Sequence, residues 1–275
     1  MNTAKEGKIS IRHASKVYDP DGLNICAVDD CSLELEAGEF CMVVGPSGCG
    51  KTTLLNAIAG FHGITGGEIY LDDKLLCSPE MLTPPGADRV VVFQNGALFP
   101  WYTVLENTMF GPVVQGESEA SASKRALELL NELGLQDTIN NYPDSLSSGM
   151  RRRVEIARAL MNDPKVLLLD EPFRAMDAMT KGIMHEFLLR VYDRVCKTIF
   201  FITHDLEEAI LLGNKVVIMT TRPCRVKQMI DVDIPRPRDF KVRTSERYFE
   251  LKNLVVEAVH EEARKAFESG ERELA

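Results

Sequence analysis

The sequence lacks the features that mark membrane-spanning and secreted proteins. Its 275 residues contain no apolar run near the ~20 residues that a transmembrane helix requires. The first residues, MNTAKEG, lack the apolar segment of a signal peptide, so we expect a chain that stays in the cytoplasm. No C-x-x-C pair occurs among the seven cysteines, and their odd number argues against a disulfide framework and a zinc site. We therefore expect buried, reduced thiols.

The sequence also lacks an excess of positive charge. It has 32 Lys and Arg residues against 41 Asp and Glu residues, a formal net charge of −9. This balance argues against broad nucleic-acid binding, and we expect no nucleic-acid partner. The hydrophobic fraction of 45% and the charged fraction of 27% are ordinary for a globular protein.

One segment, GPSGCGKT at residues 45–52, matches the phosphate-binding pattern G-x-x-x-x-G-K-[ST] at every fixed position. A buried strand is predicted before it at 40–44, and a helix after it at 52–59. A chance Gly-rich turn would leave both unexplained. In such a loop backbone N–H groups bind phosphates, the lysine reaches the terminal phosphates and the Ser/Thr hydroxyl ligates Mg²⁺. The predicted ATP-binding residues of the loop are Gly45, Pro46, Ser47, Gly48, Cys49, Gly50, Lys51, Thr52 and Thr53, with Lys51 also catalytic and Thr52 also a metal ligand.

A second motif, VLLLDE at residues 166–171, is an apolar strand that ends in two carboxylates. Beside a phosphate-binding loop, the first carboxylate can join the Mg²⁺ shell and the second can polarise the attacking water. We therefore predict Asp170 as a metal ligand and Glu171 as the general base. In isolation, a solvated acidic turn before Pro172 would be the simpler interpretation.

A third motif, LSSGM at residues 146–150, opens onto the arginine-rich helix predicted at 151–160. A helix N-terminus of this kind can bind an anion. Here the chain resembles the ATP-binding-cassette (ABC) family, whose signature reads LSGGQ or LSGGM. The resemblance covers about residues 8–225. It implies a head-to-tail dimer, most simply a homodimer, in which ATP lies between the phosphate loop of one subunit and the signature of the second nucleotide-binding subunit. The signature residues that would act in trans are Ser147, Ser148, Gly149 and Met150.

The same resemblance assigns further residues. Gln94 is similar to the family's Q-loop glutamine, which contacts both ATP and the metal, and His204 to its catalytic switch histidine. The segment 175–177 is similar to the D-loop, with Asp177 as its acid, and Tyr18 to the aromatic that stacks on adenine. Taken singly, each has a plainer interpretation: a surface aromatic for Tyr18, a polar strand end for Gln94, a helix cap for Asp177 and a core histidine for His204.

Two positions depart from the family pattern. Ser148 replaces the first glycine of the signature, and Arg174 replaces a glycine near the dimer interface. Neither removes a catalytic group. We therefore expect ATP hydrolysis with an altered rate rather than loss of activity.

The region 93–111, beginning FQNGALFPW, closely resembles the Q-loop region of the nitrate, sulfonate and taurine importer ATPases, as does ITHDLEEA at 202–209. This resemblance implies ATP and Mg²⁺ as cofactors, an integral membrane permease and an extracytoplasmic solute-binding protein. It places the chain peripherally at the cytoplasmic face of the inner (cell) membrane. Phe99, Pro100 and Trp101 would lie where a permease helix docks. The alternative is that Trp101 only packs the helical insertion.

We predict an α/β P-loop NTPase fold of the ABC type. A small antiparallel β subdomain is expected from the alternating segments 9–11, 32–36 and 68–72. An amphipathic helix is expected at 121–134, with an apolar face formed by Ala126, Leu127, Leu129, Leu130 and Leu133. Residues 1–225 would form the nucleotide-binding domain, with a helical insertion at about 100–160. Residues 226–275 would form a charged C-terminal extension with a helix at 251–268, whose alternating charges we expect on a solvated face.

Two alternatives keep the same core. A soluble ABC-type ATPase of cofactor assembly would share every motif, whereas the DNA-maintenance type is excluded because the stretch between Gln94 and Ser147 cannot hold its long coiled coil. A non-hydrolysing regulatory subunit that binds ATP is the other, suggested by Ser148 and Arg174. The sequence leaves the solute open.

Overall fold

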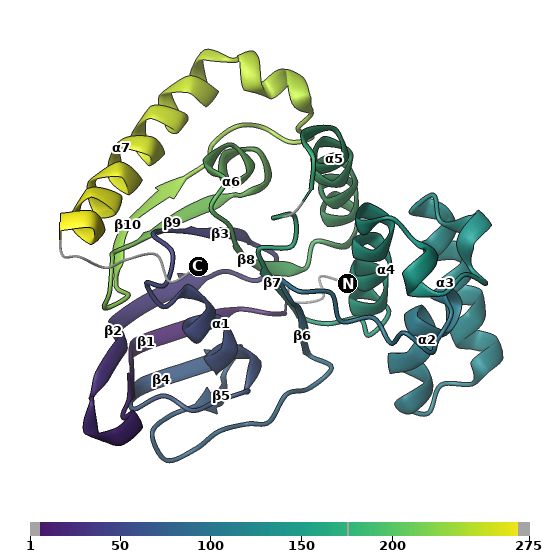
Figure 1. The fold of residues 1–275 in the computed structure, drawn as a ribbon, viewed down its shortest axis with the longest axis horizontal. Coiled ribbons are helices and arrows are strands. Elements are labelled where there is room, and N and C mark those ends of the chain that lie inside the picture. Colours follow the sequence, from purple (N-terminus) through teal and green to yellow (C-terminus); the bar gives the residue numbers. More distant parts are fainter. Residues whose placement is uncertain (1–5, 175, 269–275) are drawn as a thin grey trace.

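The computed structural model describes residues 6–174 and 176–268. Residues 1–5 lie outside the described residues, and they belong to the segment 1–7 from which the absence of a signal peptide was predicted. Ala175 of the D-loop motif also lies outside them. The described chain forms a four-stranded sheet of order β2-β1-β4-β5 and a six-stranded sheet of order β10-β9-β3-β8-β7-β6, with helices around them (Figure 1).

The small sheet is antiparallel, as its alternating sequence predicted. Ile9 pairs with Leu35 on one side and with Leu71 on the other, and all three are buried. Their side chains pack with the apolar face of the first helix, which contains Leu54 and Ile58. The strands are β1 (Ile9–Tyr18), β2 (Ile25–Leu35), β4 (Gly66–Leu71) and β5 (Lys74–Cys77), with a short 3₁₀ turn, η1 (Pro20–Gly22), between the first two.

The large sheet is parallel except at one edge. Val43 lies opposite Ile202, and Leu169 opposite Phe201, so the carboxyl ends of three strands meet at one edge of the sheet. Most of its strand residues are buried because both faces are covered, which explains their continuous apolar runs. The strands are β3 (Phe40–Val44), β6 (Arg89–Val92), β7 (Val166–Asp170), β8 (Thr198–Ile202), β9 (Lys215–Met219) and β10 (Val226–Asp231), the last antiparallel to β9.

The helices fall into two groups. In Figure 1, α2 and α3 lie at one side of the molecule, with α4 between them and the sheet. This arrangement matches the predicted helical insertion, although α3 begins two residues before the predicted start and Leu127, predicted on its apolar face, is 39% exposed. The insertion contains α2 (Val104–Val114), α3 (Glu119–Glu132), η2 (Gln136–Thr138), η3 (Pro143–Ser145) and α4 (Ser148–Leu160); α1 (Lys51–Ala59), α5 (Ala178–Val195) and α6 (Leu206–Leu212) flank the sheets.

The C-terminal segment packs on the large sheet. After β10 come η4 (Phe240–Thr244) and α7 (Glu246–Glu268), which begins five residues before the predicted helix. Tyr248, Leu251 and Val255 are buried against α6 and β9. One charge of α7 departs from the predicted solvated face: Glu262 is 2% exposed and accepts hydrogen bonds from the Thr221 backbone and from Lys265.

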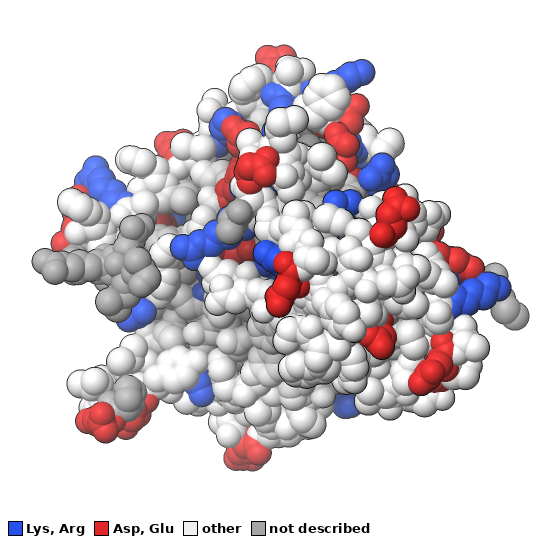
Figure 2. Space-filling model, turned by 45° about the vertical axis from the view of Figure 1, so that its right-hand side comes forward, with Lys and Arg blue, Asp and Glu red and all other residues white. Residues whose placement is uncertain are grey.

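Charged side chains of both signs are interspersed on the face shown in Figure 2, with wide uncharged areas between them. Within the described residues, no helix is both long and apolar enough to cross a membrane.

Candidate nucleotide-binding site

The phosphate-binding loop joins the carboxyl end of β3 to the N-terminus of α1. Gly50 has φ 121°, and a Cβ placed there would lie 2.4 Å from the Ala27 carbonyl oxygen. Only glycine fits this position, which explains the second glycine of the motif. Gly60 ends α1 in the left-handed conformation. The loop therefore presents the free N–H groups of a helix N-terminus at the edge where the parallel strands end.

Lys51 is a buried cation directed into this loop. Its side chain is 5% exposed, and its Nζ donates to the carbonyl oxygens of Gly45 and Pro46 at 2.9 and 2.7 Å. Among the residues that the structure describes, no carboxylate lies within ion-pair distance of it. Its Nζ also lies 3.8 Å from the Cys49 Sγ. A buried ammonium group without a carboxylate partner is suited to bind an anion such as a phosphate.

Asp170 and Thr52 place two oxygen ligands beside the loop. The Thr52 Oγ1 lies 3.4 Å from the Asp170 Oδ1. Burial raises the pKa of Asp170 above its ordinary value, although the hydrogen bond from Thr52 lowers it. No group of three His, Cys, Asp or Glu side chains that could hold a metal occurs in the described ranges. Two hard oxygen donors next to a phosphate site fit Mg²⁺, which usually takes its other ligands from substrate and water.

Three side chains of the site contact the carboxylate of Glu171. Its Oε1 lies 2.7 Å from His204 Nε2, and its Oε2 lies 3.3 Å from Gln94 Nε2 and 3.4 Å from Arg174 Nη1. Its φ of 43° is in the left-handed region, and its N–H donates to the Ile202 carbonyl at 3.0 Å. Backbone strain of this kind is common at functional sites. Burial raises the pKa of Glu171, but the hydrogen bond and the charge of His204 outweigh burial and leave the pKa below its ordinary value.

Residues of α4 hold the Q-loop in place, which the sequence did not reveal. Arg152, 8% exposed, donates to the carbonyl oxygens of Phe93 and Gln94 at 2.7 and 2.8 Å. Glu155 pairs with Arg152 at 2.5 Å and accepts from the Ala97 N–H at 2.8 Å. The arginine-rich helix after the signature therefore fixes the backbone that carries Gln94.

The signature forms the N-terminus of α4. Ser147 caps the helix by accepting from the Met150 N–H, and a Cβ on Gly149 would lie 2.7 Å from the Thr180 methyl group of α5. Ser148 lines a cavity of about 370 Å³ together with Gln94 and Arg174. No hydrogen bond or ion pair joins the signature to the phosphate loop within the described part of this subunit.

The remaining predicted residues lie around this centre. Asp177 caps α5 by accepting from the Met179 and Thr180 N–H groups, at 3.1 and 3.0 Å. Tyr18, at the end of β1, contacts His62 through its hydroxyl at 3.1 Å and through its ring edge. The Lys16 ammonium lies over its ring, 5.0 Å from the centroid, and the residue is 37% exposed.

The aromatic segment after the Q-loop is exposed. Trp101 is 66% exposed and stacks on Phe99 with ring centroids 5.7 Å apart. Phe99, Phe93 and Phe110 line a groove of about 430 Å³ between β6, α2 and α4. The Trp101 ring therefore covers the surface beside this groove rather than filling the interior of the helical insertion.

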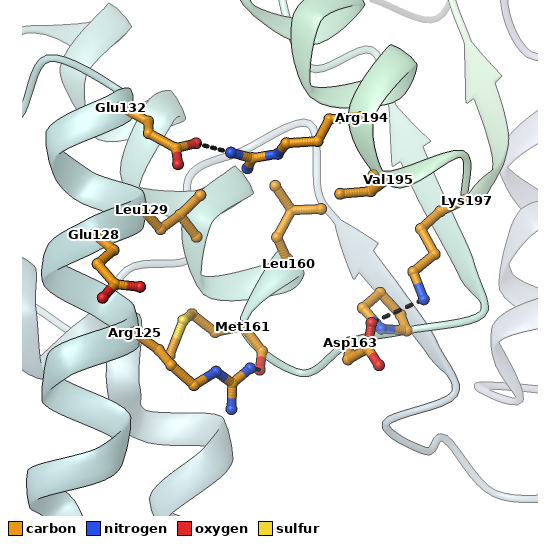
Figure 3. A pocket seen from close by; sticks show the side chains of 11 residues that line it. Arg125, Glu128, Leu129, Glu132, Leu160, Met161, Asp163, Arg194, Val195 and Lys197 are labelled. Atoms are coloured by element: carbon orange, nitrogen blue, oxygen red, sulfur yellow. Dashed lines mark hydrogen bonds and ion pairs between the residues drawn. The ribbon is translucent and has the colours of Figure 1, made fainter.

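A separate cavity of about 290 Å³ lies between α3 and the ends of α4 and α5 (Figure 3). Ion pairs join Glu132 to Arg194 and, at 2.8 Å, Asp163 to Lys197. Arg125 pairs with Glu117 at 2.6 Å. Its cations are thus already paired, and none belongs to the residues predicted for the nucleotide site.

Two further residues brace the phosphate loop from the hairpin before β10. Arg222 Nη2 donates to the Gly48 carbonyl at 3.0 Å, and the Cys224 Cβ lies 2.8 Å from where a Gly50 Cβ would be. The Cys224 thiol forms a hydrogen bond that, together with the Lys51 charge and against burial, lowers the pKa of Cys49. A motif search in the sequence carries no signal for these residues because they lie about 170 positions away along the chain.

A strand–loop–helix phosphate site, with an acidic pair on a parallel strand of the same sheet, defines a P-loop nucleoside triphosphatase. Comparisons with known proteins agree. The family model for the ABC transporter matches residues 28–174. An uncharacterized ABC transporter ATP-binding protein of Methanocaldococcus jannaschii is 40% identical over 94% of each chain. The taurine import ATP-binding protein TauB of Roseobacter denitrificans is 45% identical over 79% of this chain and 80% of its own.

A solved structure shows the same fold. The dimeric, post-hydrolysis ATP-binding cassette MJ0796 bound to ADP and Pi is 29% identical, with a TM-score of 0.71 over 82% of this chain and all of that one. The chain therefore belongs to the ABC transporter family. It is an ATP-binding and ATP-hydrolysing subunit of an importer, as the resemblance implied.

Proposed function

We propose that this subunit powers the uptake of a small solute of the nitrate, sulfonate or taurine type through a partner permease. The observation that carries the proposal is the 45% identity to a taurine import ATP-binding protein, which extends over 79% of this chain. The subunit would act peripherally at the cytoplasmic face of the membrane. A separate extracytoplasmic protein would deliver the solute.

The nucleotide would lie at the N-terminus of α1. Tyr18 would stack on the base, the backbone of residues 45–53 would surround the phosphates, and Lys51 would neutralise the terminal phosphates once they replace its carbonyl partners. Thr52 and Asp170, whose oxygen atoms lie 3.4 Å apart beside the loop, would hold Mg²⁺ together with Gln94, whose side-chain amide contacts Glu171. When bound, Mg²⁺ would offset the negative charge of the phosphates.

Glu171 would act as the general base. Its lowered pKa keeps it ionised at neutral pH, and its two oxygens let one accept a proton from water while the other stays bonded. His204, at 2.7 Å, would orient the carboxylate. Lys51 would stabilise charge that develops on the transferred phosphate.

A second copy would complete the site. The signature, Ser147 to Met150, presents a helix N-terminus whose free N–H groups suit a terminal phosphate of ATP bound to the partner subunit. Asp177, at the exposed start of α5, would lie at the same interface. ATP bound between the subunits would close the dimer, and hydrolysis would let it reopen.

The groove beside Trp101 would receive the permease. It is apolar, about 430 Å³ in volume, and adjoins the Q-loop, so a permease helix seated there would move with Gln94. An exposed tryptophan over aromatic neighbours is a typical anchor at a protein interface.

We further propose that residues 1–225 act as the nucleotide-binding domain, with its helical insertion at about 100–160, and that residues 226–275 form an extension of it. The insertion is supported by the position of α2 and α3 at one side of the molecule, with α4 between them and the sheet (Figure 1). The extension shares the sheet through β10, so it would move with the domain as one body.

The test is to isolate the Glu171→Gln variant from cell membranes in the presence of Mg-ATP and to identify what accompanies it. We expect a multi-span permease, with a solute-binding protein whose ligand defines the solute. Recovery of soluble assembly proteins alone would contradict the proposal. Wild-type protein without nucleotide serves as the control, because its dimer would not be held closed.

A further inference from the structure

The backbone on one side of His204 is held by a buried carboxylate. Thr203 Oγ1 donates to Glu208 Oε2 and accepts from the Asp205 N–H at 3.0 Å, so its hydroxyl is committed in both roles. Glu208 lies in the first turn of α6 and is 2% exposed. Burying a carboxylate costs desolvation free energy, so a buried Glu208 indicates a structural or functional role for its hydrogen bonds.

The other side of His204 is held by α5 and by the start of α6. Asp205 caps α6 with one carboxylate oxygen, which accepts from the Glu207 and Glu208 N–H groups at 3.0 and 3.1 Å. Its second oxygen pairs with Lys181 of α5 at 3.0 Å. Residues on both sides of the switch histidine are therefore fixed by neighbouring helices, while the imidazole itself extends to Glu171.

His185 of α5 connects this arrangement to the rest of the site. Its Nε2 lies 2.6 Å from Glu208 Oε1, and its Nδ1 lies 3.5 Å from Arg243 Nη2 of η4. Because a guanidinium group can only donate, Nδ1 accepts and Nε2 carries the hydrogen that Glu208 receives. The Phe173 ring, two residues after Glu171, packs on the imidazole with centroids 5.6 Å apart. His185 thus contacts both segments that carry Glu171 and His204.

We propose that the buried His185–Glu208 pair is a positioning device that sets the contact between His204 and Glu171, and that Arg243 ties the C-terminal segment to it. This inference rests on the roles proposed for Glu171 and His204. Both residues are 2% exposed, so the pair acts through the two loops. A displacement of one ångström at a catalytic contact can cost roughly a hundredfold in rate.

The test compares His185→Leu, which keeps the volume without a donor, with His185→Gln, whose amide can reach Glu208. We expect His185→Leu to lower kcat for ATP hydrolysis roughly tenfold or more while KM for ATP stays within about twofold, and His185→Gln to restore most of kcat. Glu186→Gln, at the exposed neighbouring position, is the matched control and should retain wild-type kcat. Thermal unfolding is measured on each variant.

A wild-type kcat in His185→Leu, or equal losses in the Leu and Gln variants, would overturn the proposal. His204→Ala serves as the reference variant. If His204→Ala keeps full ATPase activity, the proposed site is wrong. If His204→Ala loses activity while His185→Leu keeps the wild-type kcat, only the positioning role is rejected. If His185→Leu does not fold, the kcat of Arg243→Gln is compared with that of the control variant Lys241→Gln. We expect kcat to fall roughly threefold in the first variant only, and equal kcat in both would reject the proposal.

Discussion

The His204 imidazole and the Glu171 carboxylate are in direct contact, with Nε2 and Oε1 2.7 Å apart, although the two residues follow different strands. The contact exists because β7 and β8 are parallel neighbours whose carboxyl ends meet at one edge of the sheet. A single side chain, Glu171, consequently carries the hydrogen bonds of the Q-loop, the switch loop and Arg174.

Replacing Glu171 by Gln should abolish turnover but not binding. The amide keeps the shape and one acceptor oxygen but cannot take a proton, so we expect phosphate release to fall at least a hundredfold. Nucleotide binding, measured with a fluorescent ATP analogue, should stay near the wild-type affinity. Hydrolysis at close to the wild-type rate would rule out Glu171 as the general base.

Replacing Arg174 by Ala should change the rate only modestly. The Arg174 side chain is 66% exposed and lies 3.4 Å from Glu171, and exposed ion pairs contribute about 0–1 kcal/mol. We therefore expect kcat to change by roughly fivefold or less in a phosphate-release assay. A change of two orders of magnitude would show that this arginine belongs to the catalytic machinery.

Cys49 should react as a thiolate at neutral pH. The hydrogen bond with Cys224 and the Lys51 ammonium at 3.8 Å lower its pKa against the effect of burial. A lowered pKa means that the charged form persists below the ordinary value of about 8.5, so the labelling rate should reach half its maximum below that pH. Mass spectrometry after iodoacetamide treatment would locate the label, with the exposed Cys196 as an internal reference.

Mg-ATP should protect Cys49 if this thiol lies under the bound phosphates. We expect labelling of Cys49 to slow in its presence while that of Cys196 stays constant. Equal rates with and without nucleotide would place Cys49 outside the occupied site.

Replacing Trp101 by Ala should weaken assembly with the permease and leave ATP hydrolysis by the isolated subunit unchanged. The ring is 66% exposed and lies against Phe99 and Tyr102, so its loss should not disturb the fold. Co-purification from membranes measures the effect. Tyr142→Ala, which removes another exposed aromatic, is the control. Unchanged recovery of the permease with the Trp101 variant would disprove the docking role.

Replacing Glu262 by Ala should destabilise the protein by about 1–3 kcal/mol, because Lys227 and the Thr221 N–H would lose a buried charged acceptor. Thermal unfolding would measure this change. Glu257→Ala, on the exposed face of α7, should unfold at the wild-type temperature. Identical midpoints for the two variants would show that α7 does not depend on its buried carboxylate.

Much of the site was predictable because its signals are local in sequence. The phosphate loop, the acidic pair and the signature are short motifs, and the strands and helix that carry the loop follow from their apolar patterns. The supports of the site were not predictable, because they join distant positions. Arg152 meets the Gln94 carbonyl, and Cys224 meets the phosphate loop, only after the sheet has brought them together. Burial of Glu262 was missed for the same reason, since periodicity marks a face as charged but does not show what covers it.

The bracing of the phosphate loop by Arg222 and Cys224 has a consequence for biosynthesis. The loop is complete in sequence at residue 52, but two of the groups that hold its backbone are translated about 170 residues later. During synthesis on the ribosome, the nascent chain would therefore carry the loop without these contacts until the hairpin before β10 has emerged. We expect nucleotide capture to come late, when almost the whole chain has left the ribosome.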